Sequence, residues 1–166
     1  MEIREAGVFV PYWMGIRKRT RRIIDCVPRD RFDWSHQAGA WTFADLVRHL
    51  AAAERWMFAE NAQGRPSRYP GCGPEHADGP DAVLEYLDQL HGASCEIFAS
   101  LTPDDLSAKC ETPGGTQITV WKWLRAMVEH EVHHRGQIYL MLGILEVDTP
   151  PLYGLTEEEV EARSIG

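Results

Sequence analysis

The sequence predicts an all-α protein, a four-helix bundle, from three observations. Four long runs place apolar residues at spacings of three and four, the period of a helix with one buried face. Outside these runs no segment has the pattern of a strand, except for a little extended chain around residues 110–119. The chain of 166 residues is long enough for one complete core, so residues 1–166 are expected to form a single domain.

The first two helices have recognisable starts. The first is expected over residues 11–27, because Pro11 fits an opening turn, where its missing N–H is not needed. Five basic side chains interrupt its apolar stripe and are expected mostly on the solvated face: Arg17, Lys18, Arg19, Arg21 and Arg22. The second is expected over residues 42–62, where Thr42 and Asp45 have the spacing of a capping box.

The third and fourth helices follow a long connection. Residues 64–79 contain four glycines and three prolines and have no periodicity. At up to about 3.3 Å per residue, this connection can return along the whole second helix, so the second and third helices can run parallel. It is also expected to cover one edge of a site. The third helix begins after Gly79-Pro80, with a stripe of Val83, Leu87, Leu90, Ser94, Ile97 and Leu101.

The fourth helix, residues 119–145, is the longest run. Its apolar stripe consists of Val120, Trp123, Met127, His130, His134, Ile138 and Met141. After it, residues 148–154 form a proline-stiffened turn, and Thr156 caps a short acidic helix that continues through Glu161.

Two histidines four residues apart, His130 and His134, therefore point toward the core. His49 lies on the second helix, in a stripe of Thr42, Leu46, His49, Ala53, Trp56 and Glu60. Each ring has two nitrogens that need partners, and a dry interface offers few. A buried histidine bonded to a carbonyl explains any one of them, but all three together favour a divalent metal ion held between facing helices.

Several neighbours of these histidines are assigned by helical geometry. Gln137 lies three residues beyond His134 and can orient its ring, whereas Glu129 and Glu131 are each about 100° from His130 and are expected to be exposed. His133 is also rotated away from the stripe. Two residues of the connection, Cys72 and His76, are possible fourth ligands but are better interpreted as surface residues. Four aromatic residues are expected in the core, and some of them would line a cavity above the metal if one exists: Tyr12, Trp13, Trp56 and Trp123.

Three neutral imidazoles leave a divalent ion with its full charge and an open coordination position, a pattern typical of catalytic sites. Nitrogen ligands suit zinc, nickel, copper or iron, and the sequence does not choose among them. It also assigns no catalytic side chain beyond the ligands.

Composition limits the partners. With 17 basic and 25 acidic side chains, the net charge of −8 opposes general binding to nucleic acid or to an anionic membrane. The cysteines have no Cys-x-x-Cys spacing and are interpreted as reduced: Cys26, Cys72, Cys95 and Cys110. There is no secretory signal or spanning segment, so a cytoplasmic protein is expected. Six tryptophans, with Leu152 and Tyr153 in the turn, predict a homodimer.

Three segments resemble the DinB-like (YfiT-like) superfamily of metalloproteins: His49-Leu-Ala-Ala-Ala-Glu-Arg-Trp56, Glu129-His-Glu-Val-His-His-Arg-Gly-Gln-Ile138 and Pro150-Pro-Leu-Tyr-Gly154. The resemblance implies one four-helix-bundle domain in up-down-down-up order and a homodimer. It also implies that His49, His130 and His134 bind a divalent metal, usually zinc or nickel.

The same resemblance suggests an activity. Some relatives are thiol transferases that use bacillithiol, mycothiol or glutathione, or thiol-dependent isomerases. The expected function is therefore a metal-dependent thiol S-transferase whose partners are a small-molecule thiol and an electrophile. Two alternatives stay open: a stress-related metal-binding protein without turnover, and a hydrolase that activates water with the same three ligands.

Overall fold

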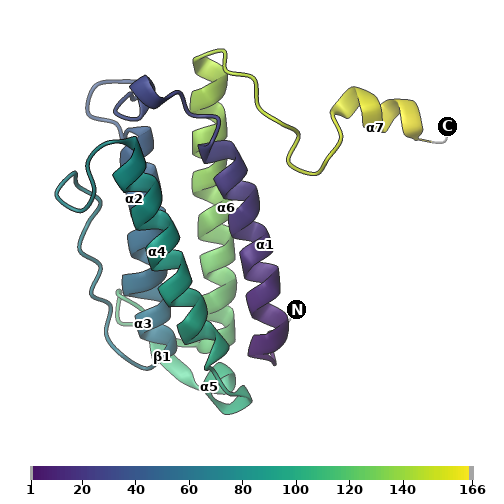
Figure 1. The fold of residues 1–166 in the computed structure, drawn as a ribbon. Helices are drawn as coiled ribbons and strands as arrows, with labels where there is room; N and C mark the ends of the chain where they lie inside the picture. The colour runs from purple at the N-terminus through teal and green to yellow at the C-terminus, as the bar shows by residue number, and fades with distance from the viewer. Residues whose placement is uncertain (1, 165–166) are drawn as a thin grey trace.

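The structure is a computed structural model that describes residues 2–164, and it confirms a mostly helical protein (Figure 1). Long helices lie side by side and form a bundle. These are α1 (Ala6–Ile24), α2 (Phe43–Ala53) with its continuation through the π-helical turn η2 (Glu54–Phe58) into α3 (Ala59–Ala62), α4 (Pro80–Ala99) and α6 (Val120–Ile144).

Helix α1 begins five residues earlier than predicted and ends at Ile24 rather than at residue 27. Pro11 therefore lies inside the helix, not in its first turn. The physical reason is packing: Ala6 and Phe9 continue the buried stripe that contains Trp13, and the Phe9 ring meets Phe98 at 5.9 Å. Burial of a phenylalanine stabilises the extra turn enough to offset the proline.

The start of α2 is as predicted. Thr42 Oγ1 accepts a hydrogen bond from the Asp45 N–H at 3.1 Å, and the Asp45 carboxylate accepts one from the Thr42 N–H at 3.0 Å. The predicted capping box is therefore confirmed.

Two charged residues contradict the expected surface positions. Arg17 is 4% exposed and Glu131 only 1% exposed, so neither lies on a solvated face. They are ion-paired with each other at 3.3 Å, and Arg17 also pairs with Glu54. Opposite charges on facing helices neutralise one another, a contact that the periodicity of a single helix does not reveal.

Short elements complete the bundle. A 3-10 turn η1 (Arg29–Arg31) lies between α1 and α2, and α5 (Pro103–Ser107) follows α4. The expected extended chain is present: β1 (Lys109–Glu111) pairs antiparallel with β2 (Gln117–Thr119), with Cys110 opposite Ile118. In α4 the stripe drifts from the expected Ile97, which is half-buried, to Phe98, which is fully buried.

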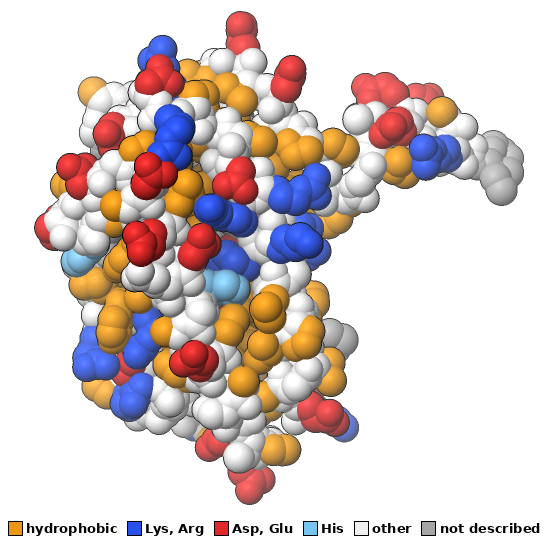
Figure 2. All heavy atoms as spheres, in the orientation of Figure 1, with side chains coloured by type: hydrophobic (Ala, Val, Ile, Leu, Met, Phe, Trp, Pro, Cys, Tyr) orange, Lys and Arg blue, Asp and Glu red, His pale blue; other side chains and the backbone are white. Residues whose placement is uncertain are grey.

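The C-terminal segment stands apart from the bundle. Helix α7 (Glu157–Arg163) begins at the predicted cap, Thr156, and projects on a linker (Figures 1 and 2). All of residues 157–163 are exposed. Across residues 2–164, no helix combines the length and the apolar character needed to cross a lipid bilayer.

The core has two clusters stacked along the bundle. One contains Leu46 and Ile138, and the other contains Phe58 and Met127. Along α6, His130 and His134 fall between Met127 and Ile138, so the histidine segment lies where the two clusters meet.

Candidate metal centre

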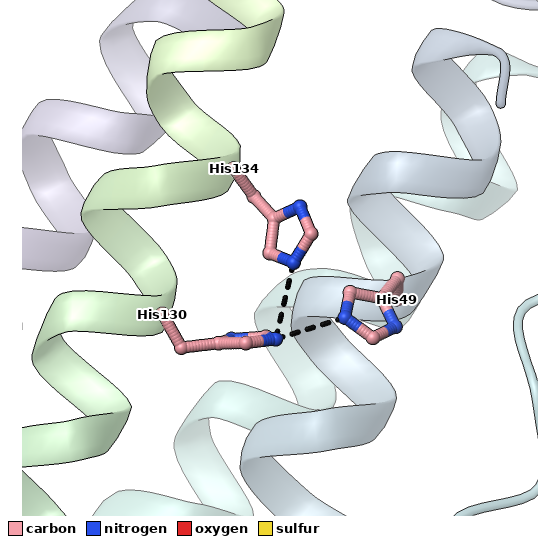
Figure 3. A group of neighbouring side chains, drawn as sticks. All are labelled: His49, His130 and His134. Carbon is pink, nitrogen blue, oxygen red and sulfur yellow. Dashed lines mark hydrogen bonds between the residues drawn. The ribbon is translucent and has the colours of Figure 1, made fainter. Parts of the chain in front are cut away.

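Helices α2 and α6 bring three imidazoles together. His49 projects from α2, and His130 and His134 project from successive turns of α6 (Figure 3). The Nε2 atoms of His49 and His130 are 2.9 Å apart, and those of His130 and His134 are 3.1 Å apart. The two helices thus bring together the three histidines that the sequence predicted.

The outer nitrogens of two rings have partners of their own. His49 Nδ1 is hydrogen-bonded to the Tyr69 hydroxyl at 2.7 Å, and His134 Nδ1 lies 2.7 Å from Gln137 Oε1. Because an amide oxygen only accepts, His134 Nδ1 carries the proton and its Nε2 presents a lone pair to the cluster. The predicted contact between Gln137 and His134 is confirmed.

The three imidazoles of the cluster are shifted toward their uncharged form. Burial lowers the pKa of His49 to about 4, with a further contribution from His134. Burial likewise lowers the pKa of His130 to about 3, and the neighbouring His134 and His49 lower it further. Burial also lowers the pKa of His134, although its hydrogen bond with Gln137 acts in the opposite direction. All three rings are therefore neutral at pH 7, the form that binds metals.

These nitrogens fit a divalent ion. Tetrahedral coordination with Zn–N bonds of 2.0–2.1 Å separates two nitrogens by about 3.3 Å, close to the observed spacings. Neutral rings at such distances cannot all satisfy one another by hydrogen bonding, because each lone pair needs a proton. A shared cation satisfies all three at once, and the ligand atoms of the group lie within 4.8 Å of one another.

Aromatic side chains surround the imidazoles. The Trp41 ring lies 4.7 Å from His49 and stacks on His134 at 5.9 Å, and Phe58 lies 5.6 Å from His130. Beside them is a pocket of about 420 Å³, lined by Trp41 and Gln137 and by His36, Ala40, Leu46, Leu140, Met141 and Ile144. The site therefore combines neutral nitrogen ligands with an adjacent, mainly apolar space.

The long connection covers one edge of the site, as expected, through Tyr69. Its two other candidates have different contacts: the Cys72 carbonyl accepts a hydrogen bond from Arg48 at 2.7 Å, and His76 Nε2 contacts the Pro70 carbonyl at 3.3 Å. Sequence reasoning missed Tyr69 and Trp41 as site residues. Both lie outside helices, so periodicity gives no signal for them.

The burial of the remaining residues near the site agrees in part with the positions predicted from helical geometry. His133 and Glu129 are exposed, as predicted. Trp13 is fully buried, whereas Tyr12 is 50% exposed and is not a core residue. Trp56 and Trp123 are half-buried, and Trp123 packs on Phe58 at 4.5 Å.

A second group of potential ligands was not predicted. Glu54 Oε1 accepts hydrogen bonds from Trp13 Nε1 at 2.8 Å and His91 Nδ1 at 2.9 Å. Cys95 Sγ lies 3.7 Å from His91 Nε2. Although burial disfavours its charge, contacts with Cys95 and Glu54 raise the pKa of His91 to about 9. His91 is therefore a cation that pairs with the buried Glu54 carboxylate.

The fold and the three histidines are similar to those of a known protein family. A model of the DinB superfamily matches residues 14–138, which include all three histidines. The structure is similar to a DinB-like protein from Bacillus cereus, with 18% identity, a TM-score of 0.70 and coverage of 86% of this chain and 94% of that chain. It is also similar to the DinB-like protein YjoA from Bacillus subtilis, with 17% identity, a TM-score of 0.69 and coverage of 86% and 95%.

A third similar structure is YfiT from Bacillus subtilis, described as a probable metal-dependent hydrolase with an unusual four-helix bundle topology. It is 17% identical, with a TM-score of 0.68 and coverage of 86% of this chain and 89% of that chain. The comparison with curated proteins found no match. At these identities the structural similarity establishes the fold alone.

Proposed function

Since the chain belongs to the DinB superfamily, we propose that it is a metal-dependent thiol S-transferase that joins a low-molecular-weight thiol to a small electrophile. His49, His130 and His134 hold one divalent ion, zinc or nickel. The observation that carries this proposal is the convergence of three neutral imidazoles, with Nε2 atoms 2.9 and 3.1 Å apart. The choice of a thiol rests on the resemblance of the chain to thiol-using relatives.

When bound, the ion supplies one property: it lowers the pKa of a coordinated thiol or water, so that a nucleophile exists at neutral pH. The protein supplies the geometry. Tyr69 and Gln137 fix the orientation of His49 and His134 through their Nδ1 atoms. Trp41 and Phe58 pack against the rings and shield them in part from water, which strengthens polar interactions inside.

The nucleophilic sulfur comes from the bound molecule. Cys72 is the cysteine of the connection that covers the site, and burial raises the pKa of its thiol. It is therefore protonated at neutral pH and a poor nucleophile. The apolar pocket beside Trp41 offers space for the electrophile.

A thiol screen tests the activity. Bacillithiol, mycothiol, glutathione and cysteine are each mixed with a generic electrophile in the presence of the wild type, His134→Ala or His133→Ala. We expect acceleration by the wild type and His133→Ala with at least one thiol, and none by His134→Ala. Equal rates for the wild type and His134→Ala with every thiol would contradict the transferase and leave two alternatives, a metal-binding protein without turnover and a hydrolase.

A second candidate is a metal-dependent hydrolase, favoured by the description of YfiT. The same ligands and open position serve water as well as a thiol. To separate the two activities, the rates of hydrolysis of activated esters by the wild type and His134→Ala are compared in the absence of any thiol. Turnover of the ester that thiols do not increase would favour the hydrolase.

The remaining architectural proposals are an up-down-down-up order within one domain of residues 1–166, a homodimer and a cytoplasmic location. The helix order is supported by the packing of α2 on α4 and α1 on α6, and by the connection that returns along the bundle (Figure 1). The dimer is supported by large exposed side chains such as Tyr153 and Leu140. Light scattering at micromolar concentration should give twice 18.8 kDa, and a mass near 18.8 kDa would refute the dimer.

A further inference from the structure

A pocket of about 420 Å³, which we call the Trp41 pocket, lies between the loop that precedes α2 and the end of α6. Two of its lining residues, Leu46 and Met141, are buried, whereas Leu140 and Ile144 are 66% and 53% exposed. Large apolar side chains that stay exposed around a concave surface are typical of a ligand-binding site. The lining therefore makes this pocket a candidate site for a small molecule.

Two residues that line the Trp41 pocket also contact the histidine cluster. The centre of the Trp41 ring lies 4.7 Å from that of His49 and 5.9 Å from that of His134. Gln137 Oε1 lies 2.7 Å from His134 Nδ1, and Nε2 of the same ring faces His130. A single imidazole ring therefore separates the pocket wall at Gln137 from the point where the three histidines meet.

The Trp41 pocket offers no counter-charge to a ligand. Of the described residues that line it, none is Asp, Glu, Lys or Arg, and the polar ones are His36 and Gln137. A charged group inside would lose hydration without gaining an ion pair, so the pocket favours an uncharged group. A pocket of about 490 Å³ at Val8 differs in this respect. Five charged side chains line it: Glu2, Arg4, Glu5, Arg125 and Glu129.

The side chains that line the Trp41 pocket also favour a ring. The indole of Trp41 is a flat wall, and the residue is 43% exposed, so part of it is free to contact a ligand. Aromatic rings pack on one another in offset or edge-to-face pairs, and the thioether of a methionine such as Met141 makes favourable contacts with a ring edge. The pocket is therefore suited to an apolar ring system without charge.

We propose that the Trp41 pocket binds an apolar, uncharged ring of the electrophile and holds it beside the histidine cluster. This inference rests on the proposed function, because it takes the histidine cluster as the place of reaction, and it adds a substrate class: a neutral electrophile that carries an apolar ring. The class follows from the lining of the pocket and is the same whether the nucleophile is a thiol or water.

Two probes that share a fused ring and differ in charge test the pocket. At neutral pH, 2-naphthalenemethanol is uncharged and 2-naphthoate is an anion. Calorimetric titration of the wild type in the presence of zinc should show binding of the alcohol and at least about tenfold weaker binding of the naphthoate, because the anion finds no partner in the pocket. Intermolecular NOEs between the naphthalene protons of the alcohol and the indole of Trp41 should locate the bound ring.

A matched pair of variants controls the result. Ile144→Lys adds a cation to the Trp41 pocket, so it should weaken binding of the alcohol by about two- to fivefold and strengthen binding of the naphthoate by a similar factor, as expected for an exposed ion pair. Val8→Lys adds the same charge to the other pocket, at a residue that is 69% exposed, and should change neither affinity. Opposite shifts for the two probes cannot come from partial unfolding.

Cobalt in place of zinc tests the link between the pocket and the histidine cluster. The unpaired electrons of Co²⁺ should broaden the NMR signals of the bound alcohol in the wild type, and His130→Ala should abolish the broadening. NOEs to Trp41 without any broadening in the cobalt-loaded protein would overturn the link. Failure of cobalt and zinc to bind would contradict the proposed function and leave the pocket standing.

The pocket has its own contradicting results, which involve neither turnover nor a thiol. Equal affinity of the wild type for the alcohol and the naphthoate would overturn the preference for an uncharged ring. Absence of NOEs to Trp41, or the same response of both probes to Ile144→Lys and Val8→Lys, would overturn the assignment of the ring to this pocket.

Discussion

Two clusters in this protein contain the residue types that bind metals, yet their chemistry differs. The first consists of His49, His130 and His134. The second consists of Glu54, His91 and Cys95. In each cluster the potential ligand atoms lie within 4.8 Å of one another. The histidine cluster has depressed pKa values and no counter-charge among its members. Both clusters bring potential metal ligands equally close together, but only the second contains a carboxylate and a cationic histidine, so charge distinguishes them.

The cluster at Glu54 is complete without an ion. The carboxylate of Glu54 accepts hydrogen bonds from Trp13, Arg17 and His91, which come from helices α1 and α4. Arg17 in turn pairs with Glu131 on α6. This buried network joins all the long helices, and its charges compensate one another. A metal site is therefore indicated by neutral nitrogen lone pairs that converge with no counter-charge among them.

The largest expected effect is at the charge network. Glu54→Gln removes the anion between Arg17 and the protonated His91, and an uncompensated buried charge costs about 3–5 kcal/mol. Urea denaturation of the metal-loaded protein should report this loss in the free energy of unfolding, with one ion still bound per folded chain. The exposed Glu129→Gln serves as control and should stay within about 0.5 kcal/mol. A loss below 1 kcal/mol for Glu54→Gln would contradict a structural role.

Removal of the metal should have the next largest effect on stability, and the effect should depend on the histidine cluster and not on the cluster at Glu54. An ion that binds the native state alone adds about 2.7–4.1 kcal/mol at free concentrations 100 to 1,000 times its Kd. A chelator should therefore lower the Tm of the wild type and of Cys95→Ala, and restored metal should raise it again. His130→Ala should melt at one temperature under both conditions. A wild-type Tm indifferent to chelator would refute the linkage.

A smaller effect on the free energy of unfolding is expected from a change of pH, through His91 in the cluster at Glu54. The pKa of His91 rises from 6.5 in the unfolded chain to about 9 in the fold. Its stabilisation is therefore complete below about pH 6.5 and is lost as the pH rises through 9, a loss of at most about 3 kcal/mol. Urea denaturation at pH 6 and pH 9 measures it, and His91→Gln should remove this part of the pH dependence. An unchanged difference between the two pH values in His91→Gln would assign the dependence to other groups.

The smallest effect should come from the residues that orient the ligands. Gln137→Ala frees the His134 ring, and loss of such a partner typically weakens metal affinity 10- to 100-fold. Competition with a chromophoric chelator measures the affinity, and the exposed His133→Ala is the matched control. Equal affinities for Gln137→Ala and the wild type would show that Gln137 does not position His134.

The sequence allowed prediction of features that repeat along one helix. His49, His130 and His134 fall on apolar stripes, and Gln137 follows from its spacing to His134. The pairing of Arg17 with Glu131 was not predictable, because it depends on which faces of two helices meet. Tyr69 reaches the site from an aperiodic connection. His91 lies on the stripe of α4, between Leu87 and Ser94, but its partner Glu54 on the facing helix is not revealed by the periodicity of one helix.

Elemental analysis of the purified protein determines whether His49, His130 and His134 bind a metal ion. We expect about one divalent ion per chain in the wild type, because three inward histidines converge from two helices. We expect the same content in His133→Ala and Cys95→Ala, and loss of the ion in His49→Ala and His130→Ala. Undiminished metal in both of the latter variants would contradict the assignment of the site.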